Sequence, residues 1–165
     1  MQLKWHKFFF VHKKNDHMKS NIKGEAQIKL NASINAVWDA LTNPATIKKY
    51  FFGTDTHTDW KVGSPIRFTG EWQGKTYEDK GTILAVEKNK LLKYSYWSSM
   101  SGIEDKPENY VIVTFDLSGK DDAVNLKITQ ENIPDEKTKD HSIDNWKKVL
   151  DGLKKVVEKE SVGQS

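Results

Sequence analysis

Residues 140–159 read DHSIDNWKKVLDGLKKVVEK, and their apolar members recur at steps of three and four residues. This spacing places them along one face of an α-helix and leaves the lysines and acids on the opposite face. The apolar positions are Ile143, Trp146, Val149, Leu150, Leu153, Val156 and Val157. A helix of about twenty residues is roughly 30 Å long, so this apolar face needs a partner surface of similar length.

The residues before this helix predict an antiparallel β-sheet. Six runs alternate apolar and polar residues with the period of a β-strand, and turn signals such as Gln73-Gly74 separate neighbouring runs. The expected strands cover residues 22–30, 66–72, 75–87, 91–97, 109–117 and 123–131. One face of this sheet is apolar and aromatic, and the C-terminal helix is long enough to cover it.

Two short helices are expected between the first two of these strands. Ser33 is a suitable N-cap, and residues 34–41 carry apolar side chains at helical spacing. Pro44 ends this helix, because the residue before a proline avoids the α conformation, and Pro44 can itself begin the next helix. The sequence therefore predicts an α+β chain with two short helices inserted after the first strand.

Length and charge limit the classes of protein to consider. The 165 residues are enough for one domain with a hydrophobic core. We expect an N-terminal extension over residues 1–20, one domain over residues 21–160 and a tail over residues 161–165. The net charge of +3 comes from the extension, and the domain itself is nearly neutral. Nucleic-acid binding needs clustered positive charge, so it is not expected.

The residue types also limit the chemistry. The chain has no cysteine, which fits a cytoplasmic location, and no apolar run approaches the ~18 residues of a transmembrane helix. His57 and His141 lack the further ligands of a zinc site, and no phosphate-binding or dinucleotide-binding motif is present. We therefore expect no metal, no cofactor and no transmembrane segment.

Several local motifs resemble one known family. Residues 33–44, SINAVWDALTNP, are similar to its VW.ALT.P motif, and Trp60-Lys61-Val62-Gly63 occupies the place of its turn before the third strand. Residues 81–84, residues 90–96 and the helix tryptophan follow in the same order. Over residues 21–159 the chain resembles the START-like (SRPBCC) superfamily, in the branch of the activator of the heat-shock-protein-90 ATPase. The resemblance implies a helix-grip fold, with a curved antiparallel sheet of six to seven strands around the long C-terminal helix.

The resemblance also implies a cavity between sheet and helix that holds a small hydrophobic or amphipathic ligand. The candidate lining residues are Phe68, Trp72, Tyr77, Asp79, Tyr94, Tyr96, Phe115, Trp146, Leu150 and Leu153. Tyr77 and Asp79 share a strand face and form a candidate polar anchor. If that face points inward, the carboxylate must be paired, solvated or protonated. The alternative is an Asp79 in water at the end of the sheet and aromatics that simply fill the core.

Three functions remain open at this point. The first is a non-catalytic binding module for a hydrophobic ligand. The second, suggested by the resemblance, is a co-chaperone-like domain that binds a chaperone. The third is a cyclase-like enzyme in which Asp79 and Tyr94 carry out acid and base steps.

Two local features add to these hypotheses. Gly152 lies inside the C-terminal helix, where a glycine costs about 0.5–1 kcal/mol relative to alanine. A close approach by the sheet or by a ligand would explain it, as would a tolerated position near the helix surface. The segment between Trp97 and Asn109 is too long for a tight hairpin, and we expect it to form a rim over the cavity mouth.

Overall fold

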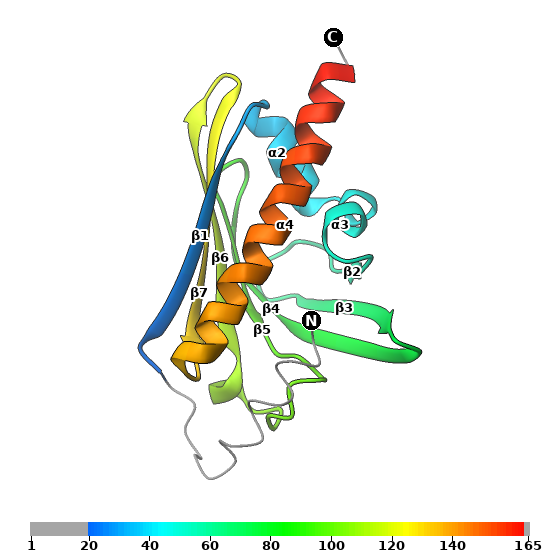
Figure 1. The fold of residues 1–165 in the computed structure, drawn as a ribbon, viewed down its shortest axis with the longest axis vertical. Coiled ribbons are helices and arrows are strands. Elements are labelled where there is room, and N and C mark those ends of the chain that lie inside the picture. Colours follow the sequence, from blue (N-terminus) through cyan, green and yellow to red (C-terminus); the bar gives the residue numbers. More distant parts are fainter. Residues whose placement is uncertain (1–19, 164–165) are drawn as a thin grey trace.

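A computed structural model describes residues 20–163, which form one sheet, three α-helices and a short 3-10 helix (Figure 1). The strands are β1 (Ile22–Leu30), β2 (Asp55–His57), β3 (Pro65–Trp72), β4 (Lys75–Glu87), β5 (Leu91–Tyr96), β6 (Val111–Lys120) and β7 (Ala123–Ile133). The helices are α2 (Ile34–Thr42), α3 (Pro44–Tyr50), η2 (Pro107–Asn109) and α4 (Glu136–Gly163). The expected extension lies outside the described residues apart from Ser20.

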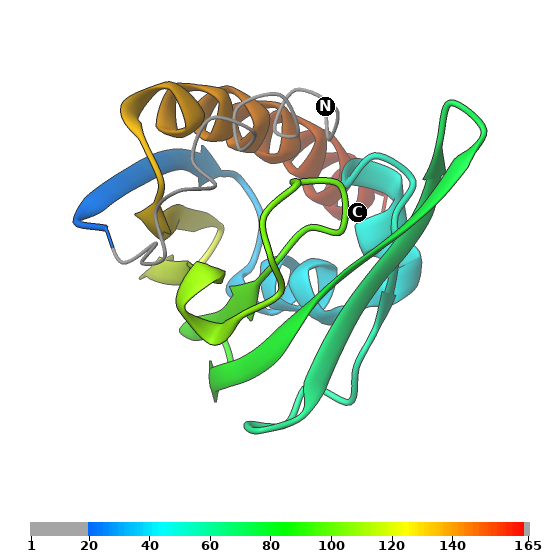
Figure 2. The ribbon, with the colours of Figure 1, turned by 90° about the horizontal axis from the view of Figure 1, so that it is seen from below.

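The sheet has the strand order β1-β7-β6-β5-β4-β3-β2, and all neighbouring strands are antiparallel. It curls around α4, which lies along β1 and β7, while α2 and α3 pack beside α4 on the same face (Figures 1 and 2). This arrangement confirms the predicted α+β helix-grip fold with a curved, seven-stranded antiparallel sheet.

The main differences from the prediction are an additional short strand and an earlier start of α4, whereas the ends of β3, β5, β6 and β7 differ by only one to three residues. β2 was not expected as a strand, because three residues are too few to show an alternating pattern; it pairs with β3 at the edge of the sheet. α4 begins four residues before the expected start, at Glu136. The side chain of Asp135 accepts a hydrogen bond from the backbone N–H of Thr138 at 2.7 Å, so it caps the helix where the apolar periodicity has not yet begun.

The core lies between α4 and the concave face of the sheet. On α4 the buried apolar side chains are those of Val149, Leu150, Leu153 and Val157. The opposing strands contribute alternating buried residues, with Val111, Val113, Phe115 and Leu117 on β6 and Val124, Leu126 and Ile128 on β7. Ser33 accepts a hydrogen bond from the N–H of Ala36 at 3.1 Å, as expected for the N-cap of α2.

Gly152 permits a close contact between α4 and α3. A Cβ at this position would lie 3.2 Å from the Cβ of Tyr50, which is tighter than most such contacts. The ring of Tyr50 is buried and its hydroxyl donates to the carbonyl of Ala40 at 2.8 Å, so it is held in place. The close approach at Gly152 is therefore made by a neighbouring helix rather than by the sheet or a ligand.

The β3–β4 hairpin extends beyond the area that α4 covers (Figure 2). Ile66 and Phe68 at the start of β3 are buried, whereas Trp72 at its end is 37% exposed. Gly70 lies opposite Tyr77, whose ring occupies the space that a side chain at Gly70 would fill. The hydroxyl group of Tyr77 in turn lies 2.7 Å from Oγ1 of Thr54, which ties the hairpin to the segment after α3.

β4 and β5 approach each other very closely at a break in their register. A Cβ at Gly81 would lie 1.6 Å from the carbonyl oxygen of Ser95. The register of the pair shifts between Ile83 and Ala85, which is typical of a β-bulge and bends the strand. This bend helps the sheet to curl around α4.

The substitution Gly81→Ala should destabilise the fold by about 3 kcal/mol or more, because the new methyl group would overlap a backbone oxygen in β5. Urea unfolding followed by circular dichroism measures the loss. Gly24→Ala is the matched control, since a Cβ there would meet only side-chain atoms at 3.2–3.4 Å. A comparable loss in both variants would contradict the steric restriction at Gly81.

Candidate functional site

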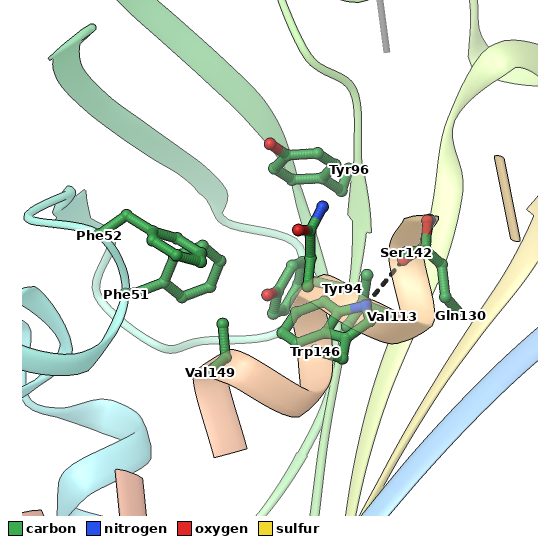
Figure 3. Close-up of a pocket in the computed structure, with 10 residues that line it drawn as sticks. Phe51, Phe52, Tyr94, Tyr96, Val113, Gln130, Ser142, Trp146 and Val149 are labelled. Carbon is green, nitrogen blue, oxygen red and sulfur yellow. Dashed lines mark hydrogen bonds between the residues drawn. The ribbon is translucent and has the colours of Figure 1, made fainter. Parts of the chain in front are cut away.

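A small cavity lies between α4, the inner face of β5–β7 and the segment that follows α3 (Figure 3). Its lining residues are Phe51, Phe52, Tyr94, Tyr96, Val113, Gln130, Ser142, Asn145, Trp146 and Val149. Seven of the ten are apolar or aromatic, and none carries a charge. The chemistry of the lining therefore suits an uncharged, largely apolar occupant.

The cavity has a volume of about 40 Å³. A buried water needs about 10–15 Å³ on this measure, whereas pockets for drug-sized ligands are usually about 300–1,000 Å³. The cavity as it stands therefore has room for a few water molecules. A larger ligand requires side chains at its edge to move.

Phe52 is the lining residue best placed to move. Its side chain is 49% exposed, and its ring meets that of Phe51 edge to face, with the centroids 6.0 Å apart. Phe52 also borders a wide surface groove along the β3–β4 hairpin, together with Tyr77 and Ser99. It therefore separates the inner cavity from this outer groove.

The backbone at this edge is unusual. Phe52 has a φ of 55° and is followed by Gly53 with a φ of 72°. A left-handed conformation is costly for a residue with a side chain, by roughly 1–2 kcal/mol. The two aromatic residues after α3 are thus held in a turn that directs Phe51 inward and leaves Phe52 at the surface.

Aromatic rings make up the wall behind the cavity. The ring of Trp146 meets those of Phe51 and Phe115 edge to face, with centroids 5.9 and 5.8 Å apart. Burial raises the pKa of Tyr94 well above its ordinary value, so this hydroxyl group stays neutral. A second void of about 20 Å³ lies beyond this wall and is lined in part by Phe68, Tyr94 and Phe115.

One polar contact crosses the cavity wall. The indole Nε1–H of Trp146 on α4 donates a hydrogen bond to Oε1 of Gln130 on β7 at 2.8 Å (Figure 3). Ser142 lies one turn before Trp146 on the same helix and also lines the cavity. The helix and the sheet are therefore joined by a polar contact inside an otherwise apolar surface.

Asp79 lies behind the cavity wall and is 1% exposed. Its carboxylate accepts hydrogen bonds from the hydroxyl of Tyr96 at 2.5 Å and from the backbone N–H of Ser99 at 3.0 Å. Ser98 and the hydroxyl of Ser99 also interact with it. The expectation of a solvated Asp79 at the end of the sheet is therefore wrong.

The contacts of Asp79 fasten the segment between β5 and β6. The same segment is held by Trp97, whose Nε1–H donates to the carbonyl of Ile103 at 3.0 Å and whose ring stacks on Tyr110. Lys80 on β4 binds Asp105 at 2.6 Å. The segment is thus attached to β4 at two points, close to the outer groove that Ser99 borders.

The candidate residues divide into five groups in the structure. Tyr94, Tyr96 and Trp146 line the cavity, and Phe68 and Phe115 stand behind it. Tyr77 and Asp79 lie outside the lining, where Asp79 contacts the lining residue Tyr96 and Tyr77 borders the outer groove. Leu150 and Leu153 are buried in the core away from the cavity lining, and Trp72 lies at the exposed end of the hairpin. The donor to Asp79 is Tyr96, whereas the cyclase-like hypothesis pairs Asp79 with Tyr94.

Sequence reasoning missed the lining residues Phe51, Phe52, Val113, Gln130, Ser142, Asn145 and Val149 as site residues. Gln130 and Ser142 did carry a signal. Gln130 continues the inward series Val124, Leu126, Ile128 on β7, and Ser142 lies four residues before Trp146 on the apolar face of α4. A polar residue at an inward position is the pattern that indicates a polar group in the cavity wall.

Within residues 20–163, no three or more His, Cys, Asp or Glu side chains come together as a metal site. No helix in this range has both the length and the apolar character that a bilayer span requires.

The burial of Asp79 should make the stability of the protein depend on pH. Burial raises the pKa of Asp79 above its ordinary value of 3.8, and the hydrogen bonds from Tyr96 and Ser99 only partly offset this effect. The folded state therefore holds this proton to a higher pH than the unfolded state does. The contribution of Asp79 to stability should fall as the pH rises from about 3.8 through the folded pKa.

A comparison of the native chain with Asp79→Asn checks the sign of this pH dependence. The contributions of the other titrating groups cancel in the difference between the two free energies of unfolding. The free energy of unfolding of the variant, relative to the native chain, should rise with pH across this window in urea titrations. A difference that falls with pH would mean that the hydrogen bonds outweigh burial.

The chain was compared with known proteins. Residues 31–158 match the family model described as Activator of Hsp90 ATPase homolog 1-like protein. A solution structure of a protein from Cytophaga hutchinsonii is 46% identical, with a TM-score of 0.74, over 85% of this chain and 96% of that chain. No curated protein matches this chain.

Two more distant structures share the fold. The Aha1 dimer from Colwellia psychrerythraea is 19% identical, with a TM-score of 0.66, over 87% of this chain and 99% of that chain. An HSP90 activator from Plasmodium falciparum is 20% identical, with a TM-score of 0.55, over 69% of this chain and 75% of that chain. The family model and the Cytophaga hutchinsonii structure together show that this chain belongs to the family of Activator of Hsp90 ATPase homolog 1-like proteins.

Proposed function

We propose that this domain is a non-catalytic binding module for a small hydrophobic or amphipathic ligand, held in the cavity between the sheet and α4. The observation that carries the proposal is an uncharged, mostly aromatic cavity under an exposed Phe52. A large aromatic side chain left at the surface loses the free energy that burial would provide. A ligand that brings apolar surface against Phe52 would recover part of it.

The size of the cavity fits a ligand that enters by displacing side chains at the edge. The rings of Trp146, Phe115 and Tyr94 pack against one another in the wall, whereas Phe52 faces solvent. Rotation of Phe52 would join the inner cavity to the outer groove that it borders. An amphipathic ligand could then place its apolar part inside and its polar part in the groove.

Asp79 has a structural role in this proposal. Its carboxylate already accepts hydrogen bonds from Tyr96 and Ser99. A general acid or base must reach a substrate proton at hydrogen-bond distance. Asp79 is instead engaged with the chain itself, which favours binding over catalysis.

Filling the cavity should weaken the binding of small apolar ligands. Val149→Leu adds a methylene group to a lining residue of α4, and we expect affinity for benzene and 1-octanol to fall at least about tenfold, because a cavity of this size tolerates little extra volume. Titrations followed by two-dimensional ¹H–¹⁵N NMR measure affinity through the indole signal of Trp146. The indole of Trp72, which is exposed and outside the cavity, serves as an internal reference.

Val156→Leu is the matched control. Val156 lies on the same helix, packs against the core and does not line the cavity. Its substitution should leave the affinity within about twofold of the native value, since distant substitutions act independently. Native protein that shows no shift at Trp146 with any of these compounds would contradict a binding role for the cavity.

Family membership favours one other function, a chaperone-binding domain. Aromatic residues exposed on a surface are frequent anchors of protein interfaces, and the exposed end of the β3–β4 hairpin carries Trp72. If the domain binds an Hsp90 chaperone through this hairpin, Trp72→Ala should weaken binding by roughly tenfold or more.

Isothermal titration calorimetry against a purified Hsp90 chaperone measures this effect. Val62→Ala is the control, because Val62 is another exposed apolar residue away from the hairpin end. The Trp72→Ala variant should keep its affinity for the cavity probes, so the two functions are separable. If the native chain gives no heat of binding with the chaperone, the chaperone-binding function is contradicted.

A further inference from the structure

Two polar groups in the cavity wall lack a hydrogen-bond partner. Gln130 is 2% exposed and Ser142 is 1% exposed, and both line the cavity. Neither Nε2 of Gln130 nor Oγ of Ser142 has a partner among the described residues. A buried polar group without a partner lowers stability, so two such groups on one small cavity need an explanation.

The orientation of the Gln130 amide is fixed by its neighbour. The indole N–H of Trp146 can only donate, so the atom of Gln130 that faces it at 2.8 Å must be the oxygen. A rotated amide would place two donors against each other. The NH₂ group of Gln130 is therefore the free group, and it is held as a donor in the cavity wall (Figure 3).

The hydroxyl group of Ser142 complements this donor. It comes from α4, whereas Gln130 comes from β7, so the two groups approach the cavity from opposite layers of the fold (Figure 3). A hydroxyl group can rotate to donate or to accept. An oxygen atom placed between them could accept from Nε2 of Gln130 and from the hydroxyl of Ser142 together.

The lining also disfavours an anionic occupant. None of the residues around the cavity is ionised at neutral pH, and burial keeps the Tyr94 hydroxyl protonated. The nearest buried acid, Asp79, already receives hydrogen bonds from Tyr96 and Ser99 on its own side of the wall. An anion would lose its hydration without meeting a positive charge.

We infer that Gln130 and Ser142 form the polar anchor of the cavity, and that its ligand is an uncharged, apolar molecule with one hydrogen-bond-accepting oxygen, such as a carbonyl. The inference rests on the proposed binding function and specifies its ligand class. It also moves the anchor away from Tyr77 and Asp79, whose polar atoms are used within the fold.

The test compares two compounds of nearly the same shape. Cyclohexanone carries a carbonyl oxygen, and methylenecyclohexane carries a CH₂ group in its place. The ketone is better hydrated in water, so the quantity to compare is the change in each affinity on mutation. The native chain and its variants are titrated with both compounds by two-dimensional ¹H–¹⁵N NMR.

Gln130→Met removes the donor and keeps an apolar side chain of similar length. We expect this change to weaken cyclohexanone binding about five- to tenfold, as for the loss of one neutral hydrogen bond, and to leave methylenecyclohexane within about twofold. Ser142→Ala should act in the same direction without disturbing the contact between Trp146 and Gln130. Thr138→Val is the matched control, because Thr138 has a buried, unpartnered hydroxyl on the same helix but does not line the cavity.

A second measurement needs no mutation. In the native chain, the side-chain NH₂ signals of Gln130 should shift with cyclohexanone and move little with methylenecyclohexane. The anchor would be overturned if Gln130→Met lost affinity equally for both compounds. It would also be overturned if the NH₂ signals of Gln130 did not shift with cyclohexanone. Either result would leave the binding function intact. Failure of both compounds to bind the native chain would instead overturn the binding function, and the anchor with it.

Discussion

The fold depends on the burial of one face of α4 against a sheet that curls around it. Leu150, Leu153 and Val157 are almost fully buried there, and each such side chain contributes about 1.5–3 kcal/mol. A straight helix and a curved sheet cannot stay in contact along their whole length. Around Trp146, large aromatic rings fill most of the space between the helix and the sheet, and a small cavity remains. The cavity is thus a consequence of the same geometry that holds the domain together.

Most of the fold could be predicted because its elements are long enough to show their period. β1 and β4 have the bounds that their alternation indicates, and the apolar stripe of α4 gives its buried face. β2 has three residues and no readable period. The need for a glycine at position 81 depends on how closely the backbone of Ser95 approaches. Such contacts between distant segments leave no local pattern in a sequence.

The site could be predicted only in part, because periodicity tells which residues point inward and does not tell what they meet. Trp146 and Leu150 lie on the same face of α4, yet the first lines the cavity and the second meets other core side chains. Trp72 shares the strand face of Phe68, but its part of the hairpin extends past the core. Gln130 was the clearest missed signal, since it interrupts an apolar series on β7.

The Asp79 carboxylate and the Gln130 amide differ in the hydrogen-bonding capacity that remains after folding. Asp79 has a larger cost of burial than an amide, and donors from Tyr96 and Ser99 offset part of that cost. Those bonds use its accepting capacity to hold a surface segment. The Gln130 amide accepts from Trp146 and keeps its donor unused inside the cavity. A ligand can form hydrogen bonds only with groups whose hydrogen-bonding capacity is not already used within the fold. For this reason the neutral amide, rather than the buried carboxylate, is the group that we propose as the anchor for a ligand.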